Sequence, residues 1–332
     1  MIKSVRIEDF DPGSPGSPGK EAFFIEISPS TSDQRLGFPV LLARGKAPGK
    51  TLVAVAGVHG DEYEGVQAIH EMFYQLNTDE MTGRLLAVPV VNLPAHWAIS
   101  RHSPIDFHNL ARVFPGKRDG SFTERLAHHL SEKIISAADF FIDLHSAGIQ
   151  YLIPPLVGYG IGGTEHARVS KEAAQIFGTP FIWGHPGEVP PGRTISEADR
   201  RGIPWLYVEA SGGARVHREE LPYYKNGLLN LLKYLRIIPG ELEPARVKYQ
   251  LVGKGDIDEA VATSTAGFFV PMVQILEHVT SNQVVGLVRD LFGETIEEIR
   301  SQQAGYVILL RAIPIVYPGE TVCVITSGSH SG

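Results

Sequence analysis

The sequence predicts an α/β fold, a mainly parallel or mixed sheet covered by helices, followed by a smaller C-terminal all-β, barrel-like domain. From about residue 50, apolar runs typical of buried strands alternate with helical segments. Several of these runs are apolar on both faces, as strands between two helical layers must be. After about residue 240 the chain changes to short β-prone runs separated by Gly and Pro.

The elements follow from the N-terminus in that rhythm. Residues 11–21, DPGSPGSPGKE, form a surface loop, and residues 21–30 alternate as a strand does; we assign 1–48 to an N-terminal β segment. The apolar runs predict strands at 51–57, 84–92, 139–146 and 203–211, and the helical patterns predict helices at 62–76, 123–138, 164–178 and 219–235. Together they make a catalytic α/β domain over residues 1–240.

A second domain is predicted over residues 245–330, after the loop at 239–244. Its β-prone runs lie at 246–253, 267–275, 284–290 and 304–326. A chain of 332 residues exceeds the size at which single cores stop growing, about 250–300 residues, which fits one large domain and one small one.

Composition excludes several classes of partner. The net charge is −7, from 30 basic and 37 acidic residues, and no basic cluster is available to follow a nucleic acid backbone. No apolar stretch approaches the roughly 18–20 residues that span a bilayer, and the N-terminus lacks the apolar core of a secretory signal, so we expect a cytoplasmic protein without membrane or nucleic acid partners. A single cysteine, Cys323, allows no internal disulfide, so any metal must be held by His, Asp or Glu.

Polar residues at the ends of apolar strands are the candidates for chemistry, because ligands of open α/β sheets bind at the carboxyl ends of the strands. Few such residues exist. His59 and Glu62 follow the strand at 51–57, His145 follows the run at 139–144, and Glu209 ends the strand that begins near 203. If these strands are neighbours, the four side chains meet at one edge of the sheet.

Two histidines and a glutamate form a known hydrolytic zinc site with one position open for water. His59 and Glu62 lie three residues apart at a helix entrance and can converge on one ion, with His145 arriving from another strand. Asp143 lies two residues before His145, on the same side of the strand, and could orient its imidazole. Glu209 is then available as the general base.

Each residue alone also has an ordinary explanation. A His-x-x-Glu pair is common by chance, and Glu62 could simply complement the dipole of the following helix. His145 alone would more often be a hydrogen-bonded core histidine. Glu209 is the hardest to dismiss, because a carboxylate that ends an apolar strand is costly unless paired. The coincidence of all four at strand ends favours the metal site.

Residues 100–120 form a polar segment that is too long for a mere connector and is therefore a candidate for substrate binding. It offers Arg101, Asp106, Asn109 and Arg112. A guanidinium can grip a carboxylate bidentately, and a second one can polarise a carbonyl and hold an oxyanion. The alternative is that Arg112 only pairs with a structural carboxylate.

These motifs resemble a known family. GVHGDEYEG, RHSPIDFHNLARVFPG, DLHS and the strand that ends in Glu209 are similar, in the same order, to the succinylglutamate desuccinylase and aspartoacylase family, which is related to the zinc carboxypeptidases. The resemblance covers most of residues 50–215, and the β-rich end resembles the barrel-like C-terminal domain of that family. GRTISEADRRGIP and VEASGG are most similar to its N-acetyl-diaminobutyrate deacetylase branch.

The resemblance implies one Zn²⁺ per chain, held by His59, Glu62 and His145, with Glu209 as general base and acid. It further implies that Arg101 polarises the carbonyl and that Arg112 anchors a substrate carboxylate. One position departs from the family, which usually has NLNR where this chain has Asn109-Leu110-Ala111-Arg112. Alanine has no donor, so one hydrogen bond to the carboxylate should be missing, unless Asn109 or another residue supplies it or the substrate differs.

We therefore expect a zinc-dependent amide hydrolase that removes an acyl group from an N-acyl amino acid or a similar small amine. Two alternatives stay open: a metallocarboxypeptidase that acts on peptides, and a protein that keeps the fold without the metal and binds a metabolite through its arginine loop. The C-terminal β domain could supply an interface for a homo-oligomer.

Overall fold

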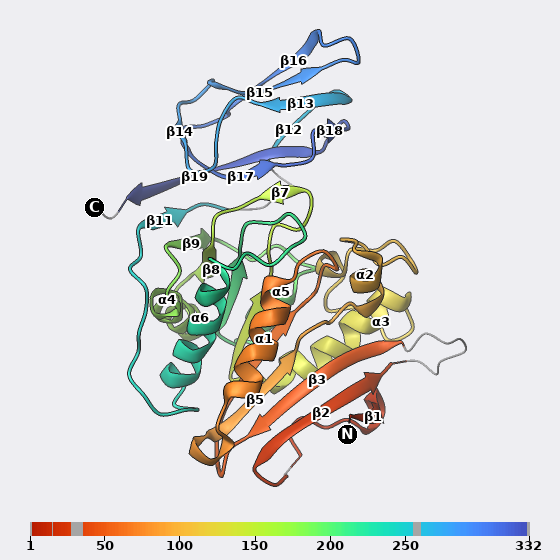
Figure 1. Cartoon of the computed structure of the whole chain (residues 1–332), viewed down its shortest axis with the longest axis vertical. Helices are drawn as coiled ribbons and strands as arrows, with labels where there is room; N and C mark the ends of the chain where they lie inside the picture. The colour runs from red at the N-terminus through yellow and green to blue at the C-terminus, as the bar shows by residue number, and fades with distance from the viewer. Residues whose placement is uncertain (1, 15, 28–35, 255–259, 331–332) are drawn as a thin grey trace.

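The computed structural model describes residues 2–14, 16–27, 36–254 and 260–330, in which fifteen strands form one large sheet and four form a second (Figure 1). The four central strands are mutually parallel, and antiparallel pairs join on both sides of them, so the sheet is mixed, as predicted. The strand order of the large sheet is β1 (Lys3–Arg6), β2 (Gly19–Glu26), β3 (Gly37–Arg44), β5 (Thr82–Val88), β4 (Ala47–Ala56), β6 (Phe140–Leu144), β10 (Trp205–Glu209), β8 (Leu156–Ile161), β9 (Phe181–Pro186), β11 (Tyr249–Val252), β19 (Thr321–His330), β17 (Gly305–Arg311) and β14 (His278–Val279), with β7 (Tyr151–Leu152) on β17 and β12 (Val261–Ala262) on β19.

Helices cover both faces of the central strands. Successive side chains of each strand point to opposite faces and therefore enter two different cores. On β4, Leu52 and Ala54 pack against one helical layer, whereas Val53 and Val55 pack against the other. The first layer contains α1 (Glu64–Gln75), α4 (Glu165–Phe177) and α6 (Leu221–Tyr234), and the second contains α3 (Phe122–His129) and α5 (Thr194–Arg200). The remaining helical segments are α2 (Leu93–Ala98), the 3-10 turns Ile7–Asp9, Thr78–Glu80, Leu110–Arg112 and Ile135–Ala137, and a π turn Leu130–Ile134.

Most predicted elements correspond to elements of the structure, and the main differences are as follows. The strand expected at 21–30 is β2, which ends at Glu26, and residues 28–30 lie outside the described part of the chain. The helix expected at 123–138 is α3 continued by the π and 3-10 turns. Strands β8 and β9 were not anticipated, because glycines interrupt their apolar patterns, LVGYGI and FIWGHP.

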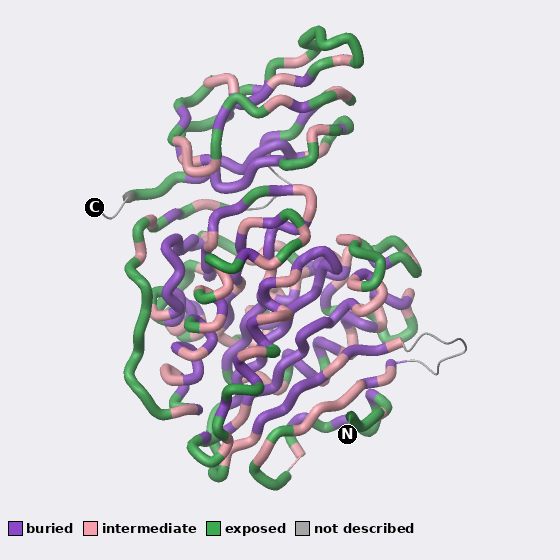
Figure 2. The backbone as a smooth tube through the Cα atoms, viewed as in Figure 1, coloured by how far each residue is buried: buried purple, intermediate pink, exposed green. Residues whose placement is uncertain are grey.

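The C-terminal region builds a second core between two sheets. The small sheet has the order β16 (Thr295–Arg300), β15 (Val284–Arg289), β13 (Gly267–Pro271) and β18 (Ile315–Val316). It packs against β12, β14, β17 and β19 around a separate cluster of buried residues (Figure 2). This confirms the smaller all-β region. The boundary near 239–244 stays a prediction, because β11, which follows it, pairs with β9 in the large sheet.

None of the helices in the described ranges combines the length and the apolar character that a membrane crossing requires.

Candidate active site

Three neighbouring parallel strands deliver the candidate residues to one edge of the large sheet. Strand β6 lies between β4 and β10, and its last residue, Leu144, is in register with Ala56 of β4 and Val208 of β10. The chain reaches His59 three residues after Ala56, reaches His145 directly after Leu144, and reaches Glu209 directly after Val208. The predicted convergence at the carboxyl edge is therefore what the strand order produces.

Two glycines let the segment between β4 and α1 approach its neighbours closely. A Cβ atom on Gly60 would lie 1.9 Å from the carbonyl oxygen of Ala95, which belongs to α2. A Cβ atom on Gly65 would lie 2.5 Å from the Cβ of Leu144, at the end of β6. Helix α1 can therefore start directly against the strand that carries His145, which brings Glu62 up to both histidines.

The carboxylate of Glu62 lies between the two histidines. Its Oε1 is 2.7 Å from Nδ1 of His59, and its Oε2 is 2.8 Å from Nδ1 of His145. One ligand atom from each of the three residues lies within 4.8 Å of the others. His59 and Glu62 are each only 3% exposed, so this cluster of ionisable groups is enclosed, which is costly unless the charges are compensated.

Without a metal ion, protons supply that compensation. Burial lowers the pKa of the His59 imidazole to about 4, and the nearby Arg101 adds to this effect. Burial alone would lower the pKa of His145, but the carboxylates of Asp143 and Glu62 outweigh it and raise that pKa well above its ordinary value. Burial alone would raise the pKa of Glu62, but the two histidines hold it well below its usual range. A cation could replace the proton on His145.

Both histidines have their second nitrogen engaged, which leaves Nδ1 for the centre of the cluster. Nε2 of His145 lies 2.9 Å from Oδ2 of Asp143, as the period of the strand predicts. Nε2 of His59 lies 3.1 Å from Oδ1 of Asn109. Because carboxylate and amide oxygens accept hydrogen bonds, both contacts favour the tautomer with hydrogen on Nε2 and a lone pair on Nδ1. This donor set of two nitrogens and one carboxylate fits a zinc ion.

Asn109, the predicted substrate-binding residue, contacts His59 in the structure, and its contact with a substrate stays a prediction. Its Oδ1 also accepts a hydrogen bond from the backbone N–H of Ala111, at 2.9 Å, and it is not among the described residues that line the cavity beside the cluster. Ala111 does line that cavity. The position that departs from the family pattern therefore borders the open space, whereas Asn109 orients a histidine.

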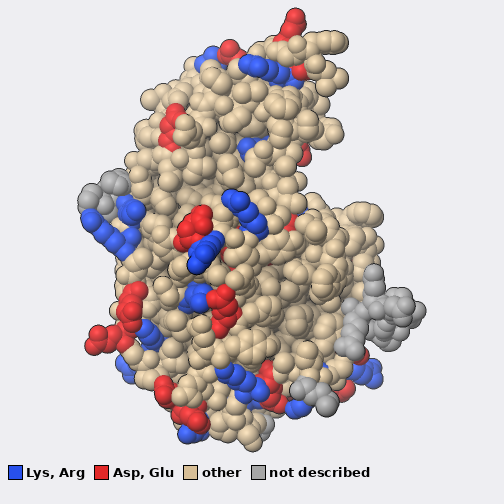
Figure 3. Space-filling view, viewed as in Figure 1, with Lys and Arg blue, Asp and Glu red and all other residues tan. Residues whose placement is uncertain are grey.

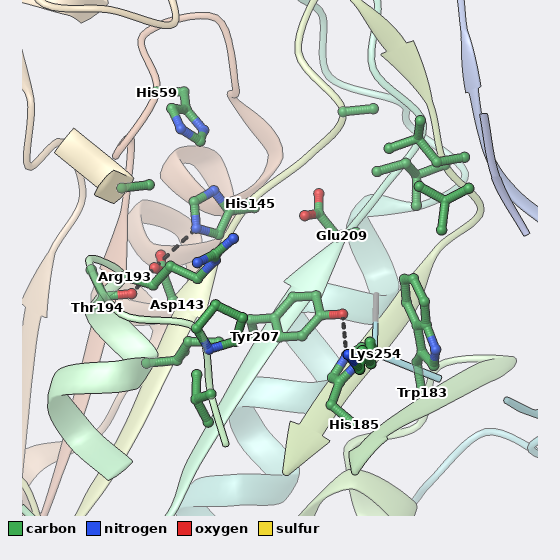
Figure 4. A pocket seen from close by; sticks show the side chains of 18 of the residues that line it. His59, Asp143, His145, Trp183, His185, Arg193, Thr194, Tyr207, Glu209 and Lys254 are labelled. Carbon is green, nitrogen blue, oxygen red and sulfur yellow. Dashed lines mark hydrogen bonds and ion pairs between the residues drawn. The ribbon is translucent and has the colours of Figure 1, made fainter. Parts of the chain in front are cut away.

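Glu209 faces the cluster without joining it. Figure 4 shows its carboxylate between His145 on one side and Trp183 on the other. Its Oε2 atom is enclosed and has no hydrogen-bond partner in the described structure. Burial, reinforced by the charges of Glu62 and Asp143, raises the pKa of Glu209 to about 8, although His145 and Arg101 act in the opposite direction. A buried carboxyl group with an unpartnered oxygen is suited to exchanging a proton with a bound molecule.

Two arginines of the segment after α2 line the same cavity. Nη1 of Arg101 lies 3.4 Å from Oε1 of Glu62 and 3.3 Å from Nδ1 of His59, so its positive charge is directed at the cluster. The guanidinium of Arg112 donates from Nη1 to the carbonyl oxygen of Ala111, at 3.0 Å. The structure therefore brings Arg101 and Arg112 to the site, as predicted from their segment.

The cavity has a volume of about 550 Å³, and its walls come from both parts of the chain. Part of its polar lining comes from residues at or just after the ends of β4, β6 and β10. Strands β17 and β19 supply Ile308, Leu309 and Val324, which close it from the side of the second core. A space of this size and mixed polarity suits a small ligand with apolar and charged parts.

Sequence reasoning did not identify several polar residues of this cavity, among them Arg193, His185 and Tyr207. Burial lowers the pKa of His185 to about 4, so the neutral ring donates from Nδ1 to the carbonyl oxygen of Gly253, at 2.8 Å. Its Nε2 then accepts the hydroxyl hydrogen of Tyr207, at 2.7 Å (Figure 4). A signal existed for Tyr207, which lies two residues before Glu209 on a predicted strand, but not for His185, because β9 was not anticipated.

A second group of ionisable residues lies nearby, formed by Glu64, His217 and Glu220. Its partners are already supplied by the protein. Nδ1 of His217 is 2.9 Å from Glu64, Nε2 of His217 accepts from Arg215, and Ser211 donates twice to Glu220. This arrangement is typical of a structural network that fixes the loop after β10 against the start of α1.

The mixed sheet between helical layers carries a His-Glu-His cluster and a facing carboxylate at its carboxyl edge, which is an arrangement suited to a hydrolase. The catalytic domain of the succinylglutamate desuccinylase and aspartoacylase family matches residues 48–235. This chain belongs to that family.

Individual relatives extend the similarity to nearly the whole chain. The N-alpha-acetyl-L-2,4-diaminobutyric acid deacetylase of Halomonas elongata is 29% identical over 314 residues, which are 92% of this chain and 91% of the relative. The product-bound ectoine utilization protein EutE of Ruegeria pomeroyi has a TM-score of 0.86 at 28% identity and covers 95% of this chain and 98% of its own. A succinylglutamate desuccinylase of Silicibacter sp. has a TM-score of 0.86 at 27% identity, with coverages of 96% and 98%.

Proposed function

We propose that the chain is a zinc-dependent deacylase that hydrolyses the amide bond of an N-acyl amino acid, with an N-acetylated diamino acid as the first candidate substrate. The arrangement of His59, Glu62 and His145 opposite the unpartnered oxygen of Glu209 carries the proposal. The relatives support the reaction class, since they are named as deacetylases and desuccinylases.

His59, Glu62 and His145 would hold the ion, with the two imidazoles already oriented by Asn109 and Asp143. Zinc supplies Lewis-acid chemistry when bound: it makes water more acidic and polarises a carbonyl group. The three residues of the cluster line the cavity, and Glu209 and Arg101 line it as well.

The protein's own residues account for the proton transfers. Glu209 takes a proton from the attacking water, whose oxygen bonds to the acyl carbon. Arg101 donates hydrogen bonds to the carbonyl oxygen as negative charge develops there. Glu209 then delivers its proton to the amide nitrogen as the C–N bond breaks, so that a carboxylic acid and an amine leave.

Substrate selection depends on arginines of the cavity that attract the negatively charged carboxylate of the substrate. Arg112 provides a planar guanidinium for the carboxylate of the amino acid. The family asparagine next to it is Ala111 here, so Arg193, which lines the same cavity, is our candidate for a second donor. The walls from β17 and β19 favour small substrates over peptides, which makes a carboxypeptidase the weaker alternative.

Metal content and a substrate panel test the proposal together. We expect about one zinc per chain by inductively coupled plasma mass spectrometry, and its loss in His145→Ala. A matched control is His166→Ala, which removes a half-buried histidine of α4 that contacts Asp199 outside the cavity and should leave the zinc in place.

The panel compares N-acetyl-diaminobutyrate, N-acetylaspartate and N-succinylglutamate with C-terminal peptide substrates. Release of a free amine from any of the first three supports a deacylase. Cleavage of the peptides alone would instead favour the carboxypeptidase. A protein that takes up no zinc and hydrolyses none of them would refute the hydrolase and leave a metabolite-binding protein.

A further inference from the structure

One hydroxyl group of the cavity wall is held by hydrogen bonds that reach across four neighbouring strands of the large sheet, β10, β8, β9 and β11. Tyr207 lies on β10, and its hydroxyl donates to Nε2 of His185 on β9, at 2.7 Å. Nδ1 of His185 donates in turn to the carbonyl oxygen of Gly253, directly after β11, at 2.8 Å. Both side chains line the cavity, yet the proposed reaction assigns no role to either.

A glycine of β8 makes this contact possible. Strand β8 lies between β10 and β9, and Gly158 is in register with Tyr207 on one side and with Trp183 on the other. A Cβ atom on Gly158 would lie 1.9 Å from Cε1 of Tyr207 and 2.6 Å from its hydroxyl oxygen. The tyrosine ring therefore lies directly over the backbone of β8 and extends across it to His185, and any larger residue at position 158 would displace the ring.

The position of the hydroxyl hydrogen follows from the protonation of the two rings. Burial lowers the pKa of His185 to about 4, so the ring is neutral and its one N–H is used by the carbonyl of Gly253. Burial and the charge of Glu209 raise the pKa of Tyr207 well above its ordinary value, so the phenol keeps its hydrogen. Because His185 accepts that hydrogen, the tyrosine oxygen can only accept a hydrogen bond from a molecule in the cavity.

This acceptor lies beside the path of the proposed proton transfer. Tyr207 and Glu209 are two residues apart on β10, so their side chains leave the strand on the same face. Figure 4 shows the hydroxyl end of Tyr207 on the opposite side of the Glu209 carboxylate from His59. A substrate whose acyl carbon lies at the His-Glu-His cluster would therefore direct its nitrogen past Glu209 toward Tyr207.

Two kinds of donor could occupy this place, a neutral amide N–H and a charged ammonium group. The positive charge of Arg193 reaches both rings, where it adds to burial in lowering the pKa of His185 and acts against burial at Tyr207, so it opposes a second cation there. Of the other charged residues that line the described cavity, Lys254 adds positive charge and the exposed Glu188 offsets it. The neutral amide N–H is therefore the better fit.

The shape of the surface agrees with a small neutral contact at this depth. Figure 3 shows the molecule hollowed between the larger and the smaller part of the chain, and the borders of this hollow are largely free of charged residues. The cavity takes its walls from the same two parts. A hydrogen-bonding group without charge is then well placed to tell similar ligands apart.

An acceptor for the amide N–H would also assist the proton transfer by Glu209. After water has added to the acyl carbon, the nitrogen becomes tetrahedral and must turn its lone pair toward Glu209 to receive the proton. An N–H bond held toward Tyr207 leaves the lone pair free on another side of the nitrogen. The C–N bond then breaks as the proton arrives, and the amine leaves with both hydrogens.

We propose that Tyr207 accepts a hydrogen bond from the amide N–H of the substrate, and that His185 is a positioning residue that keeps Tyr207 an acceptor. The inference rests on the proposed deacylase function and adds a rule of selection to it. The site prefers a secondary amide to the ester of the same shape, because the ester has an oxygen where the amide has N–H. The loss of one hydrogen bond corresponds to about 10-fold in affinity.

Binding to the chelated, metal-free protein tests the hydrogen bond without any turnover. The probes are N-acetyl-2-aminobutyrate and 2-acetoxybutyrate, which share the carboxylate and differ only in N–H or O beside the acetyl group. By calorimetry we expect the wild type to bind the amide about 10-fold more tightly than the ester, and Tyr207→Phe to bind both equally. Tyr159→Phe is the matched control and should keep the preference, since Tyr159 lies on β8 in the opposite core and not in the cavity lining. Equal affinities for the wild type, a preference that survives in Tyr207→Phe, or no binding of either probe would overturn the proposal.

The ratio of kcat/KM for the amide to that for the ester, measured on the zinc-loaded enzyme, tests the role of His185. His185→Leu should lower this ratio about 10-fold, whereas His185→Gln, whose side-chain oxygen can still accept from the Tyr207 hydroxyl, should retain it. A partly unfolded variant loses both activities equally, so the ratio does not respond to a merely structural role. An equal fall of the ratio in both variants would exclude the positioning role.

The two measurements also separate this inference from the proposed function. A preference in binding, with no hydrolysis of either probe by the zinc-loaded wild type, would refute the deacylase and leave the hydrogen bond to Tyr207 in place. Hydrolysis of both probes without a preference in binding would refute the hydrogen bond and leave the deacylase.

Discussion

Replacement of Asp143 by asparagine tests how the site is held ready for its metal. Asp143 is 1% exposed, and its Oδ2 accepts hydrogen bonds from Nε2 of His145 and from the hydroxyl of Thr194. Its other oxygen, Oδ1, is enclosed and has no hydrogen-bond partner in the described structure. Asparagine can keep one accepting oxygen, but it removes the negative charge and places an NH₂ group where no acceptor waits.

Two effects of different size follow. Loss of an outer partner of a metal-binding histidine costs about 10–100-fold in metal affinity, which corresponds to about 1.4–2.8 kcal/mol. A buried NH₂ group without an acceptor costs a further ~1–3 kcal/mol of folding stability, whether or not metal is bound. We therefore expect Asp143→Asn to bind zinc 10–100-fold more weakly and to unfold at a lower denaturant concentration even in its metal-free form.

Zinc competition against a chromophoric chelator measures the first effect, and urea unfolding of the chelated protein measures the second. Asp199→Asn is the matched control, because Asp199 also accepts from a histidine, His166, and from the indole of Trp205, but lies outside the cavity. An Asp143→Asn protein with wild-type zinc affinity would refute the reasoning that this carboxylate orients His145.

Three further changes test other parts of the molecule. Glu209→Gln should lower kcat by about 10²–10⁴-fold while zinc content measured by mass spectrometry stays at the wild-type value, and an active variant would exclude Glu209 as the general base. Arg112→Ala should raise KM about 10–100-fold for substrates with a carboxylate and leave N-acyl amines without one unchanged; an equal effect on both would exclude the anchoring role. Burial alone would raise the pKa of Glu297, but hydrogen bonds from Thr263, Ser264 and Thr265 outweigh it and lower the pKa to about 2. Because this folded-state pKa lies below the unfolded value, the stabilisation is complete above about pH 4.5 and is lost as the pH falls toward 2. Wild type should therefore exceed Glu297→Gln by about 1–2 kcal/mol in urea unfolding at neutral pH, and a gap that does not narrow on acidification would contradict this assignment.

The sequence was most informative where one rule decides both position and chemistry. His59, His145 and Glu209 could be placed together because polar residues at the carboxyl ends of parallel strands share an edge, and β4, β6 and β10 are indeed neighbours. Contacts between segments far apart in the sequence were harder to predict. Asn109 is drawn to His59 across fifty residues of sequence, and nothing in its local pattern separates that contact from a substrate contact.

Strands that could not be recognised in the sequence also limited the prediction of the cavity. Gly184 interrupts the apolar pattern of β9, so His185 could not be recognised as a residue at a strand end. The cavity walls from β17 and β19 depend on how the second core packs against the first, which periodicity does not encode. Tyr207 could be identified only by its position two residues before Glu209 on the same strand.

The pairing of β11 between β9 and β19 has a consequence for any shortened form of the protein. A chain cut near residue 240 would keep every proposed zinc ligand and Glu209, yet it would lose the strand that covers β9. The uncovered backbone of β9 would then be free to pair with other chains, and His185 would lose the carbonyl of Gly253 that fixes its tautomer. The β-rich end therefore covers one edge of the large sheet and also supplies part of the cavity wall.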